Sequence, residues 1–151
     1  EYAPLGTEAS VTNTATVSGT GITPVTAAET VNAEAAPNLA ITKSVSPVPV
    51  TENGTLTYTF RIQNYGSVAA TNTTGVVITD TFAPVLNNLT AALNGTAWTA
   101  ATDYTYDEAT GTFSSTAGAI TVPAATYTQD STTGAWVVTP GESTLVITGT
   151  V

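Results

Sequence analysis

The sequence predicts an all-β protein with the Greek-key arrangement of an Ig-like β-sandwich, and three observations lead to this prediction. Threonine is the commonest residue, and Thr and Val both favour strands. Stretches in which apolar and polar residues alternate are separated by Gly, Pro and Asn, which are typical turn residues. No stretch has the spacing of an amphipathic helix. Short strands at regular intervals with such turns are typical of a sandwich.

The first elements that we expect are two extended stretches. Residues 9–18 alternate as a strand does, and Asn13 lies on the apolar face of that strand. A second extended stretch follows at 23–31, and a short linker comes after it. We therefore expect an N-terminal donor strand and linker over 1–36, and the Ig-like sandwich domain over 37–151.

Three strands are expected in the first half of this domain. Residues 39–45 alternate, and a Pro-rich turn connects them to a strand over 55–64. After a loop or edge strand, residues 75–82 alternate again. Each of these stretches has an apolar face that we expect to point into the core.

The second half contains two similar stretches. Residues 104–113 and 127–136 both read Tyr-Thr-Xaa-Asp-Xaa-Xaa-Thr-Gly-Xaa followed by an aromatic residue. We expect each to form a hairpin in which Gly111 or Gly134 takes the left-handed conformation of a bulged turn. The last alternating stretch, 141–151, has no closing strand after it, so the sandwich is expected to be open beside this strand.

The composition limits the classes of partner. The chain has 151 residues and a hydrophobic fraction of 42%, which is sufficient for a core. Its net charge is −9, with two basic residues and no histidine, so it has little with which to neutralise phosphates. We therefore expect no nucleic-acid partner and no attraction to an anionic membrane surface. No apolar run is long enough to span a bilayer, so no membrane insertion is expected.

The stretch 37–82 resembles a known repeat. It contains Leu-Ala-Ile-Thr-Lys, a Pro-rich turn, Tyr-Thr-Phe-Arg-Ile-Gln-Asn, and Val-Val-Ile-Thr-Asp-Thr. These features resemble the repeat known as domain of unknown function 11, and 141–151 resembles its end moderately. The resemblance implies an Ig-like sandwich of mainly structural role, of the kind that occurs in tandem in long bacterial and archaeal surface proteins.

The order of the elements differs from this family's pattern. Its final strand resembles Val-Thr-Asn-Thr-Ala-Thr-Val, which here occupies 11–17. The resemblance therefore implies a repeat cut out of phase, in which a neighbour's N-terminal strand completes each sandwich. The neighbour is either the next repeat of a tandem chain or a separate subunit of a head-to-tail homopolymer. Closure within one chain is a third possibility.

Three polar residues lie on apolar faces that we expect to be buried, namely Lys43, Asp80 and Asn13. Such a cluster has the parts of a self-forming isopeptide bond, in which the lysine amine attacks the asparagine amide and ammonia leaves. Burial favours the neutral amine that the attack requires, and it keeps a carboxyl group protonated. We assign Asp80 the catalytic role and Lys43 and Asn13 the crosslink. The alternatives are a plain buried Lys43–Asp80 ion pair beside a hydrogen-bonded Asn13, and a misread strand register.

Other kinds of chemistry have less support. Without His or Cys the chain has no Ser–His or Cys–His arrangement, so we do not expect an enzyme. The acidic residues Asp103, Asp107, Glu108 and Asp130 lie in predicted turns and are expected to be solvated. The oxygen-rich segment 103–111 lacks a calcium-loop motif, so neither a metal site nor a cofactor is assigned.

The predicted function is mechanical. We expect a structural subunit or repeat of an extracellular fibre or stalk on a prokaryotic cell surface, and the absence of Cys and Met fits an oxidising environment. The alternative is an adhesin module that binds carbohydrate or protein through 85–135, where Trp98 and Trp136 could form a platform. Glycans are possible partners, because four sites fit the N-glycosylation pattern. These sites are Asn53, Asn72, Asn88 and Asn94.

Overall fold

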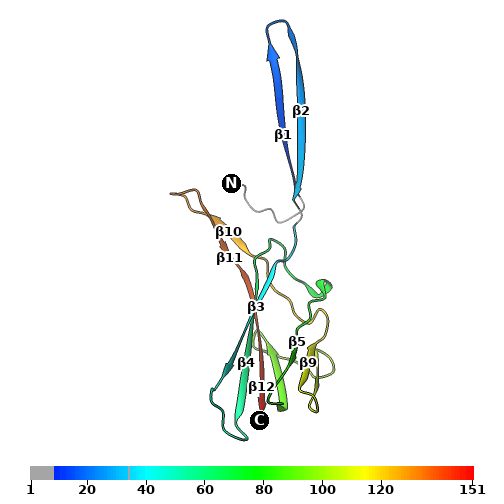
Figure 1. Cartoon of the computed structure of the whole chain (residues 1–151), viewed down its shortest axis with the longest axis vertical. Coiled ribbons are helices and arrows are strands. Elements are labelled where there is room, and N and C mark those ends of the chain that lie inside the picture. Colours follow the sequence, from blue (N-terminus) through cyan, green and yellow to red (C-terminus); the bar gives the residue numbers. More distant parts are fainter. Residues whose placement is uncertain (1–8, 34) are drawn as a thin grey trace.

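The structure, a computed structural model, describes residues 9–33 and 35–151, and nearly all of its regular elements are strands (Figure 1). Two antiparallel sheets pack face to face, and two hairpins project from them. The helical content of the described chain is one 3-10 turn, Asn72–Thr74. The prediction of an all-β, Ig-like sandwich is therefore confirmed.

The larger sheet has the strand order β3-β4-β12-β6-β7. Its strands are β3 (Leu39–Ser46), β4 (Thr55–Asn64), β12 (Gly141–Thr150), β6 (Asn87–Leu93) and β7 (Thr96–Ala97). The last strand, β12, pairs with β4 on one side and with β6 on the other. The expectation that the sandwich is open beside this strand is therefore wrong, because the backbone of β12 has partners on both sides.

The smaller sheet has the strand order β5-β9-β8. Its strands are β5 (Thr79–Thr81), β9 (Thr112–Ser115) and β8 (Tyr104–Asp107). The strand expected over 75–82 is thus shorter than predicted. Its flanks still bond to β9 and the turn before it, because the Ser115 amide donates to the Ile78 carbonyl at 2.9 Å and the Phe82 amide donates to the Gly111 carbonyl at 2.9 Å.

The core lies between the two sheets. The alternate residues of β4 and β12 that point inward are buried, as the alternation predicts: Leu56, Tyr58, Phe60, Ile62, Leu145 and Ile147. Aromatic rings fill the space between the sheets, with the Phe82 ring centroid 4.7 Å from that of Tyr58 and 6.3 Å from that of Phe113. Such ring pairs contribute area burial and favourable edge and face contacts.

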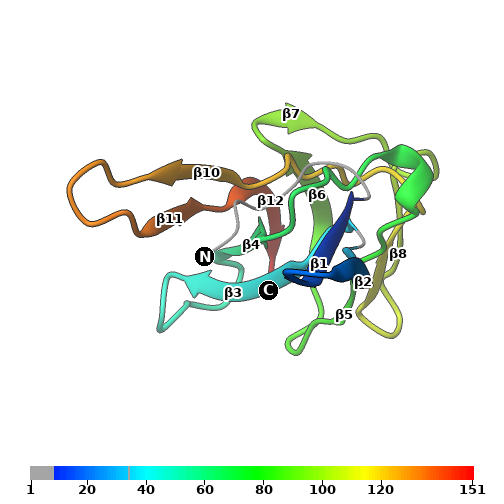
Figure 2. The same ribbon diagram turned by 90° about the horizontal axis from the view of Figure 1, so that it is seen from above.

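The two similar stretches both form hairpins. The first joins β8 to β9, and the second joins β10 (Thr126–Gln129) to β11 (Trp136–Thr139), which projects from the sandwich (Figure 2). Gly111 has φ 74° and Gly134 has φ 73°. Because L-residues with a side chain rarely adopt this region, the turn chemistry explains both glycines, and the prediction is confirmed.

The N-terminal region forms a long hairpin of β1 (Ala9–Gly19) and β2 (Ile22–Ala33). It extends away from the sandwich along the long axis of the molecule (Figure 1). Neither strand pairs with any strand of the sandwich in the described chain. The two extended stretches are thus confirmed, but the second one is the partner of the first and continues into the region expected to be a linker.

Candidate functional site

Strand β3 lies at the edge of the larger sheet, and its inward face is exposed. Lys43 pairs with Phe60 of β4, and Ile41 pairs with Ile62. Because Phe60 and Ile62 point into the core, Lys43 also lies on the core-directed face, and the predicted register of this strand is confirmed. The expectation that this face is buried is wrong, since Ile41 is 53% exposed. The physical reason is that the smaller sheet ends at β5, and no described strand lies opposite β3.

A groove therefore runs between β3 and β5. One hollow of about 390 Å³ lies at one end, and another of about 170 Å³ lies at the other. The first is lined by Lys43, Ser44, Val45, Tyr58, Thr81 and Ala83. The second is lined by Leu39, Ala40, Ile41, Ile62, Val76, Val77 and Ile78. Most of these residues are apolar, so the groove is an uncovered part of the core.

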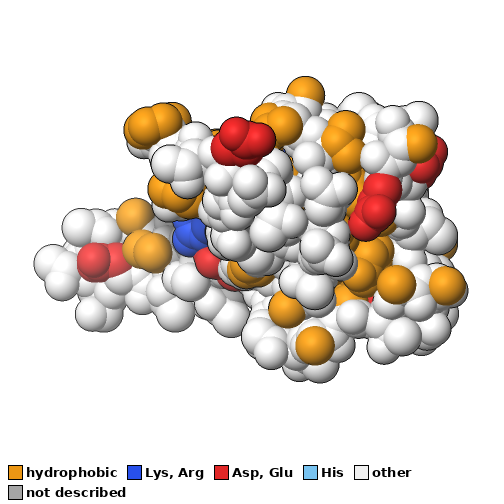
Figure 3. All heavy atoms as spheres, turned by 90° about the horizontal axis from the view of Figure 1, so that it is seen from below, with side chains coloured by type: hydrophobic (Ala, Val, Ile, Leu, Met, Phe, Trp, Pro, Cys, Tyr) orange, Lys and Arg blue, Asp and Glu red, His pale blue; other side chains and the backbone are white. Residues whose placement is uncertain are grey.

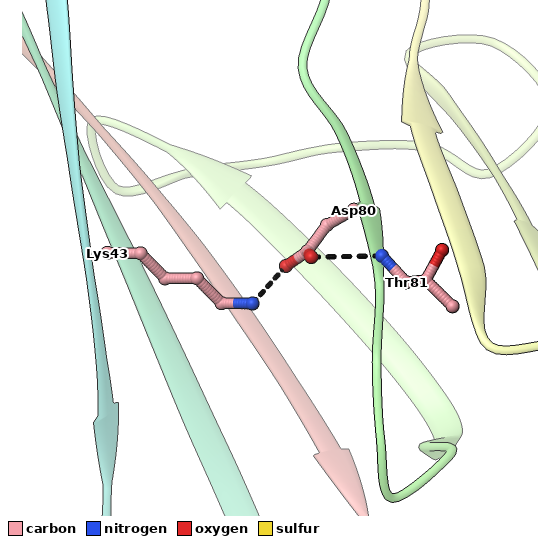
Figure 4. Close-up of polar contacts among 3 residues, drawn as sticks. All are labelled: Lys43, Asp80 and Thr81. Carbon is pink, nitrogen blue, oxygen red and sulfur yellow. Dashed lines mark hydrogen bonds and ion pairs between the residues drawn. The ribbon is translucent and has the colours of Figure 1, made fainter.

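Lys43 and Asp80 bridge this groove (Figure 4). The Lys43 Nζ donates a hydrogen bond to Asp80 Oδ2, and the Asp80 Oδ1 accepts one from the Thr81 amide at 2.9 Å. The side chain of Lys43 is 41% exposed and that of Asp80 is 19% exposed. Lys43 is therefore not the core lysine that the alternation predicts, and the pair is solvated in the open groove.

Three aromatic rings surround the lysine amine. The Nζ atom of Lys43 lies 4.8 Å from the ring centroid of Tyr58, 5.2 Å from that of Phe82 and 5.5 Å from that of Phe60. These contacts favour the cation while the groove is open to water. The same rings would form a dry wall around the amine if a further strand covered it.

Asn13 is not near Lys43 and Asp80 in this chain. It lies in β1, where it is exposed and pairs across the hairpin with Glu29 of β2. The expected three-residue cluster is thus only partly assembled, with the lysine and the acid together and the asparagine on the projecting hairpin. Sequence reasoning missed Glu29, although the alternation of Val25, Ala27 and Glu29 in the second extended stretch would have placed it on the same face.

The hairpin has one apolar face and one polar face. Residues that pair directly lie on the same face of a sheet. On one face, Val17 pairs with Val25 and Ala15 pairs with Ala27. On the other face, threonines pair with one another, and the hydroxyl groups of Thr12 and Thr30 are 2.8 Å apart. The apolar face is exposed, with Val17 63% and Val25 62% accessible.

The outer edge of β5 is open for strand pairing. Asp80 pairs with Phe113 of β9, and its peptide groups point toward β9. In an antiparallel ladder the neighbouring residues point their peptide groups away from that strand. Thr79 and Thr81 therefore direct their peptide groups away from β9, toward the open edge of the smaller sheet. One of these groups, the Thr81 amide, already donates a hydrogen bond to the Asp80 carboxylate. An exposed edge of this kind is a template for an additional strand.

The other acidic residues have structural roles in turns. The Ala109 amide and the Thr110 hydroxyl bond to the Asp107 carboxylate and lower its pKa from the usual value. The amides of Thr133 and Thr132 do the same for the pKa of Asp130. Among the described residues, no three His, Cys, Asp or Glu side chains gather as a metal site would require.

Two of the remaining candidate residues, Trp98 and Asn94, have local partners, whereas the buried Nε1 of Trp136 has no hydrogen-bond partner in the described part of the chain. Trp98 packs against the core and stacks on Tyr104, with ring centroids 6.5 Å apart. Among the four possible glycosylation sites, Asn94 uses its amide group to hold a turn against β12: it donates to Ser143 Oγ at 3.2 Å and accepts from the Thr144 amide at 2.8 Å. A turn role therefore explains this asparagine.

The exterior is acidic and carries few charges. Acidic side chains are scattered among apolar groups and uncharged surface on the face drawn in Figure 3. The exposed Arg61 of β4 pairs with Glu142 at 2.5 Å. Within the described residues, no helix has the length and hydropathy that a membrane-spanning segment requires.

Comparisons with known proteins add no relative. No family model matches the chain, and no curated protein and no solved structure is significantly similar to it. The function is therefore argued from the residues themselves.

Proposed function

We propose that this protein is a structural unit of an extracellular prokaryotic fibre or stalk, assembled by β-strand complementation. The observation that carries the proposal is the uncovered groove between β3 and β5, which has an apolar floor and an open strand edge. A strand inserted there extends the smaller sheet and covers the inward face of β3. Main-chain hydrogen bonds then supply affinity, and alternate side chains supply specificity.

The hairpin strand β1 fits this groove in length and pattern. It has 11 residues and β3 has 8, so at about 3.3 Å per residue β1 is long enough to cover the whole inward face of β3. An antiparallel alignment places Asn13 opposite Lys43, Ala15 opposite Ile41 and Val17 opposite Leu39. Polar residues then meet only at the position of the Lys43–Asp80 pair. The donor is the β1 of an adjoining copy, either a tandem repeat or a separate subunit.

Docking also completes the chemistry of a Lys43–Asn13 isopeptide bond. When the strand excludes water, the lower dielectric favours neutral groups, and the proton of the Lys43 ammonium passes to Asp80. The free amine attacks the Asn13 Cγ while the Asp80 carboxyl donates to the amide oxygen. The Nζ–Cγ bond forms and the Cγ–Nδ2 bond breaks. One proton of the amine moves to the leaving nitrogen, and ammonia departs.

The open groove explains why the bond would form only after assembly. In the single chain the Lys43 side chain is partly exposed to water, and its amine is held by Asp80 and three aromatic rings. Covering the groove removes water from the same groups. The crosslink is therefore a lock that follows docking, and it hardens the fibre against pulling.

Intact-mass measurement and denaturing electrophoresis of the assembled protein test this function. We expect covalent multimers in which each Lys43–Asn13 pair has lost one ammonia. Asp80→Asn should leave the fold intact and block the crosslink, and Asn13→Ala should block it as well. Asn32→Ala, which changes the opposite face of the hairpin, is the matched control and should crosslink normally. A protein that stays monomeric at high concentration, with full mass and a free Lys43, would contradict the proposal.

The competing function, an adhesin module acting through 85–135, has weaker support. Its proposed platform residue Trp98 is stacked on Tyr104. The exposed Val137 and Val138 of the projecting β10–β11 hairpin are the main apolar feature near that region. Saturable binding of a carbohydrate or protein by the full chain, abolished by Val138→Asp, would favour this function.

A further inference from the structure

We infer that the donor is the whole β1–β2 hairpin, which docks as a two-stranded unit, and this inference rests on the proposed function. The occupant of the groove is thus the hairpin of a second copy of this chain, with β1 paired to the edge of β5 and β2 beside it. The three-stranded sheet β5-β9-β8 then becomes a five-stranded sheet, in which β1 covers β3 and β2 lies next to the open edge of β3.

The two strands of the hairpin share one apolar face. The register pairs Val17 with Val25 and Ala15 with Ala27, so both strands present their apolar residues on the same side (Figure 2 shows the two strands side by side). Insertion of β1 alone would leave the valines of β2 in water. Val25 is 62% exposed and Val31 is 70% exposed, and two-stranded docking places both beside the edge of β3, where part of their apolar area is covered.

The stability of the hairpin itself also favours docking as a unit. A two-stranded hairpin is marginally stable at best in water, and this one has no strand partner among the described elements. Separating β2 from β1 for single-strand insertion would break the ladder that already satisfies their backbone groups. Docking the hairpin intact keeps this ladder and adds a new one at the edge of β5.

Strand β2 also brings a charged side chain to the site. Glu29 is paired with Asn13 on the inward face. Directly paired side chains have Cβ atoms about 5 Å apart, so the Glu29 carboxylate can accept a hydrogen bond from the Asn13 amide. Two-stranded docking therefore brings a carboxylate toward Lys43 together with the asparagine. Glu29 becomes a positioning residue that orients the amide for attack.

The test measures reversible association of the full chain by sedimentation velocity, in an Asn13→Ala background that cannot crosslink. Val17→Asp places a charge on the inward face of β1, and Val25→Asp does so on the inward face of β2. Thr26→Asp places the same charge on the outer face of β2 and is the matched control. We expect both valine variants to weaken association by about 100-fold or more, and the control to leave it nearly unchanged.

The outcomes separate the two proposals. If Val17→Asp weakens association and Val25→Asp does not, single-strand insertion is correct and the two-stranded inference fails. If Thr26→Asp weakens association as much as Val25→Asp, the effect is not specific to the inward face and the inference also fails. If none of the variants changes association, strand complementation itself fails.

The role of Glu29 has a separate readout in the chain with Asn13 intact. Glu29→Gln should retain association but slow ammonia loss, because an amide orients Asn13 less strongly than a carboxylate. It should also change the pH dependence of the crosslinking rate, which involves Lys43, Asp80 and Glu29. Identical rates and pH profiles in Glu29→Gln and the unchanged protein would remove Glu29 from the site.

Discussion

Asn64 is the residue that most tightly joins the loops of the sandwich. It is fully buried at the end of β4, and its Oδ1 accepts from the amides of Asn38 and Gly66, each at 2.9 Å. Its Nδ2 donates to the carbonyl groups of Val68 at 2.7 Å and Pro123 at 3.0 Å. One side chain thus satisfies four backbone groups from three separate segments. Unlike the partly exposed Lys43–Asp80 pair, this polar group is fully buried and has a structural role.

Replacing Asn64 should therefore be costly. Asn64→Ala leaves these four backbone groups without their partner, and we expect the free energy of unfolding to fall by about 2–4 kcal/mol. Urea denaturation of the two proteins measures this difference. Asn72→Ala, at an exposed position in the 3-10 turn, is the control and should change stability by about 0.5 kcal/mol or less. Equal effects of the two substitutions would show that the buried network adds nothing.

At the scale of elements, the two similar hairpins have the same turn chemistry but different surroundings. The β8–β9 hairpin packs on the core through Tyr104 and Phe113, which are 4% and 0% exposed. The β10–β11 hairpin projects and has no buried residue in its strands. The same local sequence pattern therefore has different consequences for the stability of the whole protein.

This difference predicts the effects of two matched substitutions. Asp107→Asn should lower the thermal midpoint at pH 7, and Asp130→Asn should lower it less, because the strands of its hairpin contain no buried residue. Because the pKa of Asp107 is lowered in the folded state, its stabilising effect is complete above the unfolded pKa. The effect is lost as the pH falls below about 4, through the folded pKa.

Thermal unfolding followed by circular dichroism at pH 7 and at pH 3 tests this prediction. The difference between Asp107→Asn and the unchanged protein should be smaller at the lower pH. A difference of equal size at both pH values would mean that the turn hydrogen bonds do not depend on the charge of the carboxylate.

At the scale of the whole molecule, the groove that we propose as the acceptor is separate from the hairpin that we propose as the donor. The groove lies between β3 and β5, and the hairpin extends from the same chain along its long axis (Figure 1). A molecule with complementary surfaces at different places assembles head to tail, and it forms an open filament when the rotation between neighbours does not close a ring. The proposed fibre follows from this separation.

A mixing experiment distinguishes closure within one chain from assembly between chains. The Asn13→Ala chain keeps Lys43, and the Lys43→Ala chain keeps Asn13, so neither can crosslink alone. When the two are mixed, we expect covalent dimers on denaturing gels, because the hairpin of one docks in the groove of the other. The control for loss of a basic residue is Arg61→Ala, which keeps both Lys43 and Asn13 and should still crosslink.

The opposite result would be equally informative. If the mixture gives no covalent dimer while the unchanged protein loses ammonia as a monomer, the bond closes within one chain. The chemistry at Lys43 would then stand, and the fibre would not.

Much of the fold could be predicted from the sequence. Alternation placed the strands 39–45, 55–64 and 141–151 and put Lys43 on the core-directed face, because the two-residue period of a strand is a local property. The glycines of the repeated turns were equally readable, since few other residues adopt a positive φ. The short strands β6 and β7 were missed, because their small and polar residues alternate weakly.

The tertiary structure alone decided what covers each face. Alternation cannot distinguish a buried strand from an edge strand with the same face, so the exposure of β3 and the solvated state of Lys43 depended on where the smaller sheet ends. It also decided that residues 9–33 form a hairpin that brings Glu29 beside Asn13. The physical reason is that a side chain's direction depends on its own backbone, whereas its burial depends on strands distant in the sequence.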